Sequence, residues 1–208
     1  MTWHHVEIGG KSADVFEPAS PSRFNLLWLH DRDGTTPPEV PEGFTVVCPI
    51  APRTWWCGES ARHILDDVIP WMRSTGKPFA IAGVGMGGQG ALRLAFQHPE
   101  AFPVVAAIDA AIDHYEWYGR GTELDAMYAS KERCRQDSAT LHVHPARQPR
   151  FIWFGCDPAS EWFRGNDRLR EKLFALGVSH RADLESSRPA IDWDFVVAGL
   201  EQIQRSLI

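Results

Sequence analysis

Residues 79–92 read Phe79-Ala-Ile-Ala-Gly83-Val-Gly85-Met-Gly87-Gly-Gln-Gly90-Ala-Leu92, and this stretch decides the fold. A short apolar run of strand length leads into a cluster of glycines, and a run of small, helix-compatible residues follows at once. Glycine has no side chain, so it permits a tight turn around which a strand and a helix pack closely. The stretch therefore predicts a strand, a sharp turn and a helix in direct succession.

The predicted turn has the arrangement of a nucleophile elbow, in which a Gly-x-Ser-x-Gly motif presents a serine between a strand and a helix. Here the outer glycines are Gly83 and Gly87, but the middle position is Gly85. The hydroxyl nucleophile of a hydrolase is therefore absent from its expected place. Glycine also relieves the backbone strain at this position, which costs other residues on the order of 1–3 kcal/mol.

The stretch resembles the elbow of α/β-hydrolases of the esterase D and feruloyl-esterase type, which commonly reads Gly-x-Ser-Met-Gly-Gly followed by Gly-Ala-Leu. The similarity continues through Leu94-Ala95 and His98-Pro99 to Phe102. It implies an α/β-hydrolase fold with a mostly parallel sheet and helices on both faces. At 208 residues we expect a single domain, 1–208, with no room for a sizeable cap domain.

Apolar segments along the chain alternate as such a sheet requires. We expect strands at 3–8, 13–16, 24–29, 44–48, 79–82, 104–108, 150–154 and 181–184. Helices are predicted around 61–72, directly after the elbow, around 169–176 and around 193–207. Pro70 should kink or end the first of these helices, because proline lacks a backbone N–H. One or two short helices are expected within 113–149.

The resemblance also locates the other members of a catalytic triad, which follow the nucleophile in the order acid, then histidine. Asp157 lies just after the strand 150–154, where the acid is expected. Alternatively, Asp157 caps a turn before Pro158, which is a common use of aspartate. In related esterases the histidine precedes an aromatic residue near the last helix, and the register of Trp193 places Ile191 there. An aliphatic side chain cannot exchange protons, so a second catalytic group is absent.

The oxyanion hole of such an enzyme is formed by two backbone N–H groups. Met86, directly after the nucleophile position, is expected to supply one of them. Asp31 stands in the loop expected to supply the other, where related esterases have glycine. Its carboxylate would repel an anionic reaction intermediate. The neighbouring His30 is interpreted either as a pocket residue or as a side chain that hydrogen-bonds its own loop.

Cys57 is the alternative nucleophile, because it follows the strand 44–48 and should lie on the same rim as the elbow. A reactive thiolate there would need a cationic neighbour to lower its pKa. Water activated by His30, His114 or Asp157 is a second alternative.

Several of the nine tryptophans are expected in loops near this rim, among them Trp55, Trp56 and Trp117. Aromatic faces there would stack on sugar or phenolic rings, and otherwise they pack beneath long loops.

Composition and charge exclude several other functions. The net charge of −6 and the absence of basic runs argue against nucleic acids and anionic membranes as partners. No segment approaches the roughly 18 apolar residues of a membrane span, and no secretory signal is recognised, so we expect a soluble, cytoplasmic protein. The four cysteines lack C-x-x-C spacing, and the histidine pairs lack a third ligand. We therefore expect no metal and no cofactor.

These observations predict a catalytically inactive esterase homologue that retains a pocket for a small ester, phenolic or carbohydrate ligand, or for a partner protein. One alternative is an active carboxylic-ester hydrolase that uses Cys57 or an activated water. Another is a structural or interaction protein. An open cavity above Gly85 lined by tryptophans would favour ligand binding, whereas a filled one would favour a structural role.

Overall fold

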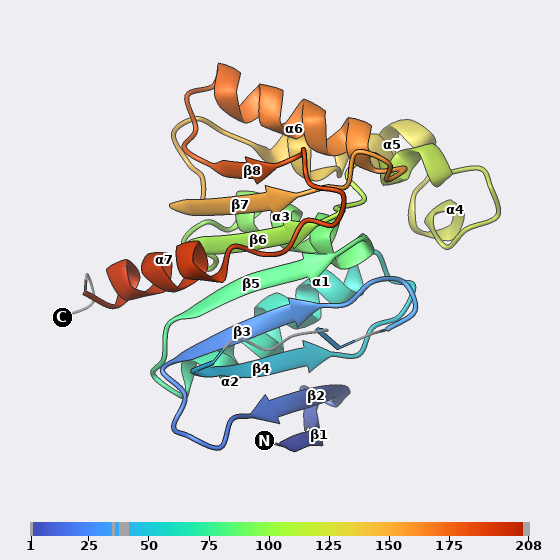
Figure 1. The fold of residues 1–208 in the computed structure, drawn as a ribbon. Helices are drawn as coiled ribbons and strands as arrows, with labels where there is room; N and C mark the ends of the chain where they lie inside the picture. Colours follow the sequence, from blue (N-terminus) through green and yellow to red (C-terminus); the bar gives the residue numbers. More distant parts are fainter. Residues whose placement is uncertain (1, 35, 38–41, 206–208) are drawn as a thin grey trace.

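The computed structural model describes residues 2–34, 36, 37 and 42–205, and these residues form a mixed sheet with the strand order β1-β2-β4-β3-β5-β6-β7-β8 (Figure 1). The antiparallel pairs are β1 with β2 and β2 with β4, and the pairs from β4 to β8 are parallel. The strands are β1 (Thr2–Ile8), β2 (Lys11–Glu17), β3 (Phe24–Leu29), β4 (Phe44–Pro49), β5 (Phe79–Val84), β6 (Val104–Ile108), β7 (Phe151–Gly155) and β8 (Arg181–Asp183).

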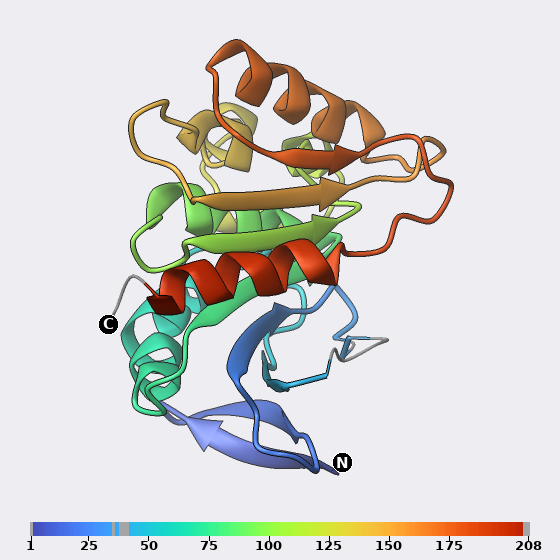
Figure 2. The same cartoon turned by 60° about the vertical axis from the view of Figure 1, so that its left-hand side comes forward.

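Helices cover both faces of the sheet, as expected (Figures 1 and 2). One face is covered by α7 (Trp193–Arg205), whose Val196 and Leu200 pack in an apolar cluster with Trp28 and Trp153. The other face carries α1 (Glu59–His63), α2 (Ile69–Arg73), α3 (Met86–Gln97) and α6 (Phe163–Ala175). The central strands β3 and β5 are buried almost throughout, which is why they read as continuous apolar runs.

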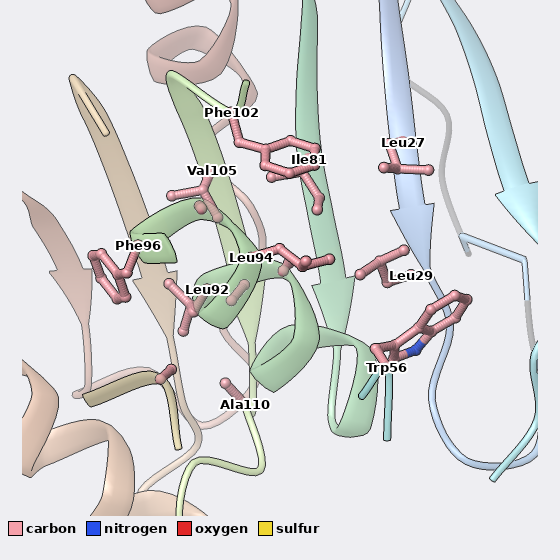
Figure 3. Close-up of a cluster of buried hydrophobic side chains, with 14 of the residues drawn as sticks. Leu27, Leu29, Trp56, Ile81, Leu92, Leu94, Phe96, Phe102, Val105 and Ala110 are labelled. Atoms are coloured by element: carbon pink, nitrogen blue, oxygen red, sulfur yellow. The ribbon is translucent and has the colours of Figure 1, made fainter. Parts of the chain in front are cut away.

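Helix α3 lies at the centre of the larger apolar cluster. Figure 3 shows its Leu92 and Leu94 close to side chains of β3, β5 and β6, including Leu29, Ile81 and Val105. All five of these side chains are fully buried. This packing fixes α3, and with it the elbow, against the middle of the sheet.

The helix predicted around 61–72 does not end at Pro70. The helical run continues past this residue, because a π-helical segment, η1 (Ile64–Val68), separates α1 from α2. Pro70 then lies in the first turn of α2, where a missing N–H costs little. The wider π turn thus accommodates a proline that an uninterrupted α-helix would not.

The segment 113–149 contains the two short helices expected there, together with two 3₁₀ segments. It contains the 3₁₀ segments η2 (His114–Trp117) and η3 (Ala139–His142) and the short helices α4 (Leu124–Met127) and α5 (Lys131–Gln136). Ser130 caps α5 through a side-chain oxygen that accepts a hydrogen bond from the backbone N–H of Arg133. Only the two 3₁₀ segments were not anticipated from the sequence.

The elbow has the tight geometry that its glycines predicted. A Cβ on Gly87 would lie 1.8 Å from the carbonyl oxygen of Leu29, and one on Gly83 would lie 2.5 Å from the carbonyl oxygen of Gly87. Gly85 has φ +55°, a backbone conformation that L-residues rarely adopt. The end of β3 and the start of α3 therefore approach more closely than any side chain at position 83 or 87 would allow.

Replacing Gly87 with alanine should destabilise the protein by about 3 kcal/mol or more, because the new methyl group meets rigid backbone that cannot move aside. Denaturant unfolding of Gly87→Ala beside Gly88→Ala measures this. Both positions lie on α3, but a Cβ on Gly88 meets its nearest atoms at 3.1 Å. Equal stability of the two variants would contradict the tight approach at Leu29.

Candidate active-site region

The nucleophile position is covered by a carboxylate from the neighbouring loop. A Cβ on Gly85 would lie 2.3 Å from Oδ1 and 2.5 Å from Cγ of Asp31. The same Oδ1 accepts a hydrogen bond from the backbone N–H of Met86 at 2.8 Å. Met86 N–H is the donor expected to stabilise an oxyanion, and here it is bonded to a side chain of the protein itself.

The covering loop is held in place by His30, which is buried with 3% of its surface exposed. The backbone N–H of Ala51 donates to Nε2 of His30 at 3.0 Å, so the ring proton is on Nδ1, which donates to the carbonyl of Asp31 at 2.5 Å. The indole N–H of Trp56 donates to the carbonyl of His30 at 3.0 Å. Burial lowers the pKa of His30, which favours this neutral form. These bonds fit the interpretation that His30 holds its own loop.

Asp157 adopts the arrangement of a turn-capping aspartate. Its Oδ1 accepts a hydrogen bond from the backbone N–H of Ala159 at 2.7 Å, and its carbonyl accepts one from the N–H of Ser160 at 2.9 Å. The backbone N–H of Asp157 donates to Oδ1 of Asp109 at 2.9 Å. This geometry agrees with the alternative of a turn before Pro158, and no histidine side chain is among its hydrogen-bond partners in the described part of the chain.

Ile191 packs into the apolar cluster beneath α7, with 7% of its surface exposed. The following residue, Asp192, accepts a hydrogen bond from the backbone N–H of Phe195 at 2.9 Å and so begins the helix. The loop that would carry a catalytic histidine thus contributes an aliphatic side chain to the core. Proton transfer by a side chain at this position is chemically impossible.

Cys57 and His114, the alternative catalytic groups, are both buried. The Cys57 thiol donates to the carbonyl of Trp55 at 3.2 Å, and burial raises its pKa to about 11. His114 has 0% of its surface exposed, and burial lowers its pKa to about 4. Near neutral pH the thiol is protonated and the imidazole is neutral. A protonated thiol is a poor nucleophile, and an imidazole with no exposed surface cannot contact a water above Gly85.

The expected aromatic lining of a pocket is largely inside the core. Trp55 and Trp56 have 1% and 0% of their surface exposed, and Trp55 stacks on His114 with ring centroids 5.6 Å apart. Trp117 is half-buried and contacts Trp162 at a centroid distance of 5.4 Å. The buried pair corrects the expectation of an open, tryptophan-lined cavity above Gly85, because loop 53–57 turns its aromatic side chains inward. Arg53, Trp55 and Trp56 all have positive φ, the left-handed conformation that this inward turn uses.

A buried polar cluster on the far side of Cys57 was not anticipated from the sequence. Arg93 of α3 is 8% exposed and forms an ion pair with Asp137, with Nη2 and Oδ1 2.7 Å apart. The signal was present in the sequence. Arg93 interrupts a helix face of small and apolar residues, which is typical of a buried, paired charge rather than a solvated one.

No group of three or more histidine, cysteine or acidic side chains suited to a metal ion occurs among the described residues. None of the helices in those ranges combines the length and the apolar character needed to cross a bilayer.

Comparison with known proteins identifies the fold. No protein-family model and no curated sequence matches this chain. Among solved structures, a ferulic acid esterase is 16% identical, with 97% of this chain and 95% of that chain covered and a TM-score of 0.66. The chain has the α/β-hydrolase fold.

Two further structures agree with this fold. MPT51 of Mycobacterium tuberculosis is 13% identical, with 99% of this chain and 97% of that chain covered and a TM-score of 0.67. An S-formylglutathione hydrolase from Agrobacterium tumefaciens is 16% identical, with 98% and 92% covered and a TM-score of 0.60. At such identities the similarity establishes the architecture, and the chemistry has to be argued from the residues themselves.

The burial of His114 predicts a stability that declines in mild acid. Its pKa is about 4 when folded and about 6.5 when exposed, so the unfolded chain binds a proton first as the pH falls. The free energy of unfolding should therefore decrease from about pH 6.5 to about pH 4, by about 3 kcal/mol from this group. The lowered pKa of His30 acts in the same direction.

Denaturant unfolding between pH 7.5 and pH 4 should show a shallower decline for His114→Phe, which keeps an aromatic ring beside Trp55. The decline that remains in this variant includes the contribution of His30. An unchanged pH dependence in His114→Phe would show that His114 is not the group responsible.

Proposed function

We propose that this protein is a non-hydrolytic member of the α/β-hydrolase fold whose nucleophile and oxyanion positions are occupied by its own Asp31 carboxylate. The observation that carries the proposal is the position of Oδ1 of Asp31, 2.8 Å from the Met86 nitrogen and 2.3 Å from the site of a Cβ on Gly85. A substrate carbonyl oxygen would have to displace a bonded carboxylate to reach the same donor.

Electrostatics supports the same conclusion. Ester hydrolysis develops negative charge on the former carbonyl oxygen, and an oxyanion hole accelerates the reaction by stabilising that charge. Asp31 instead places a negative charge at this point while its carboxylate is bonded to Met86, so the transition state is repelled rather than stabilised. The start of helix α3 favours a negative charge there, and the carboxylate of Asp31 already supplies it.

The alternative of an active hydrolase with another nucleophile has less support. A Cys57 thiol with a pKa of about 11 is almost entirely protonated at neutral pH. Both ring nitrogens of His30 are engaged in hydrogen bonds, and His114 is fully buried. The Asp157 carboxylate already accepts a bond from its own turn. None of these groups is free to activate a water above Gly85.

A binding role remains part of the proposal. The structural neighbours include a protein described as a ferulic acid esterase, and the ligand classes consistent with such a scaffold are small esters, phenols and carbohydrates. Because Asp31 closes the elbow and Trp55 and Trp56 are buried, such a ligand would have to bind elsewhere on the chain. By the criterion of a filled elbow, a structural or interaction role is favoured over ligand binding above Gly85.

The first test is restoration of the missing groups. Gly85→Ser/Ile191→His alone should stay inactive, because the new side chain at position 85 overlaps the Asp31 carboxylate. Adding Asp31→Gly should give hydrolysis of 4-nitrophenyl acetate at least about 100-fold above the double variant, the lower end of the usual gain from general acid–base catalysis. The matched control is Asp31→Gly/Gly85→Ser with Ile191 retained, which lacks a proton acceptor.

Activity of the double variant equal to that of the triple variant would show that Asp31 does not block the site. Circular dichroism of each variant checks that the fold is intact, since Ile191→His places an imidazole in an apolar cluster.

The unmodified protein should not hydrolyse 4-nitrophenyl acetate above the rate of the buffer, and Cys57→Ala should behave identically. Steady-state assays from pH 6 to pH 9 measure both. Turnover by the unmodified protein that disappears in Cys57→Ala would overturn the proposal in favour of a cysteine hydrolase. Turnover that survives Cys57→Ala would indicate an activated water.

A further inference from the structure

Strand β1 forms one edge of the sheet, and no strand among the described residues pairs with its outer side (Figure 1). It is seven residues long and pairs with β2 in an unbroken register, from Thr2 opposite Glu17 to Ile8 opposite Lys11. An edge strand carries a row of backbone N–H and C=O groups that can pair with a further strand. The outer side of β1 is therefore a candidate interface.

The two edges of the sheet differ in their protection against such pairing. Proteins protect an edge with a very short strand, a charged side chain, a proline or a bulge. At the opposite edge, β8 has three residues and begins with Arg181, whose side chain is 62% exposed. β1 is more than twice as long as β8, contains no lysine, arginine or proline, and pairs with β2 without a bulge. Of the two edges, β1 offers the longer and more regular one.

The turn between β1 and β2 determines which backbone groups point outward. Gly9 and Gly10 both have positive φ, +57° and +74°, as in the type I′ turn of a two-residue hairpin. The residues flanking such a turn, Ile8 and Lys11, form a hydrogen-bonded pair, and such pairs recur at every second residue. The even-numbered residues of β1 thus direct their backbone groups towards β2. The residues whose backbone groups face outward are Trp3, His5 and Glu7.

The side chains along this edge are complementary to a second copy of the same strand. When two antiparallel copies of β1 are centred on Val6, His5 of each copy lies opposite Glu7 of the other. Both residues direct their backbone groups outward, so the two positions form hydrogen-bonded pairs across the interface. Among the described residues, the carboxylate of Glu7 has no hydrogen-bond or ion-pair partner. The second copy supplies one.

His5 is suited to this contact. Its side chain is 58% exposed, and its Nδ1 lies 3.0 Å from Oδ1 of Asp14. A protonated imidazole donates from both nitrogens, so Nε2 is available to a second carboxylate, that of Glu7 in the other copy. Centring the pair on His5 instead would place the two imidazoles opposite each other and Glu7 opposite Trp3. Opposite charges therefore favour the register centred on Val6.

We propose that two copies of this chain associate through β1, antiparallel about a two-fold axis at Val6, so that one sheet continues through both copies. Val6 of each copy then lies opposite Val6 of the other in the closer type of antiparallel pair, with Cα atoms about 4.5 Å apart. One pair of strands is a small interface, so we expect a weak dimer with a Kd of about 100 μM. The inference is independent of the non-hydrolytic role, because β1 is at the sheet edge and the elbow follows the central strand β5.

Sedimentation equilibrium at pH 6, over about 10 to 500 μM protein, measures this association. The weight-average mass should rise from the 23.4 kDa of one chain towards twice that value. Glu7→Pro should weaken association at least about tenfold, because proline removes an outward N–H that the pairing of β1 with β2 does not use. A monomer mass at every concentration would overturn the proposal, and so would unchanged association of Glu7→Pro.

A charge reversal tests the side-chain contact. Glu7→Lys should weaken association at least about tenfold, because it places a lysine opposite His5 of the other copy. The matched control is Glu17→Lys, which makes the same change of charge on the inner strand β2 and should associate like the unmodified protein. Equal association of these two variants would contradict the contact between His5 and Glu7.

Mixing Glu7→Lys with His5→Glu tests the register. Each variant alone places like charges opposite each other, whereas the mixed dimer has opposite charges at both contacts. The mixture should associate at least about tenfold more tightly than either variant alone. A mixture that associates no better than its components would overturn the register centred on Val6. Circular dichroism checks the fold of His5→Glu, which adds a carboxylate opposite Asp14, and if this variant is unfolded the Glu7→Pro and Glu7→Lys results decide the proposal.

Discussion

The close approach of the end of β3 to the start of α3 governs the rest of the site. The carbonyl of Leu29 occupies the space that a Cβ on Gly87 would need, so only glycine allows the two elements to meet. His30 and Asp31 directly follow β3. Because the end of β3 contacts the start of α3, these two residues lie over the elbow. The hydrogen bond from Met86 N–H to the Asp31 carboxylate then joins the strand end to the first turn of the helix.

This arrangement uses the start of α3 to bind a side chain of the protein itself. A helix start has unpaired N–H groups and a partial positive charge, and an enzyme of this fold uses them to stabilise a developing oxyanion. In this protein the N–H of Met86 donates to the Asp31 carboxylate, and Gly85 adopts the positive φ of the turn without strain. Under the proposed non-hydrolytic role, these features favour stability over activity. Ile191, which stands where the resemblance predicts the loop histidine, likewise packs in the apolar cluster beneath α7.

Around the elbow, too, side chains of the protein itself fill the space that a ligand would need. Trp55 and Trp56 turn inward and fill space beneath loop 53–57, so aromatic surface that would contact a ligand contributes to packing instead. Farther along α3, Arg93 forms a buried ion pair with Asp137.

The sequence by itself determined the strands, the order of the main helices and the elbow, because apolar periodicity and glycine spacing act over a few neighbouring residues. It also determined that Gly85 and Ile191 cannot perform the chemistry of serine and histidine. Only the tertiary structure decided which side chain lies above Gly85. Asp31 and Met86 are 55 positions apart, and the partners Arg93 and Asp137 are 44 apart, so no local pattern records either contact. The inward turn of Trp55 and Trp56 and the passage of the helix through Pro70 were likewise set by packing, which selects among backbone conformations that the local sequence leaves open.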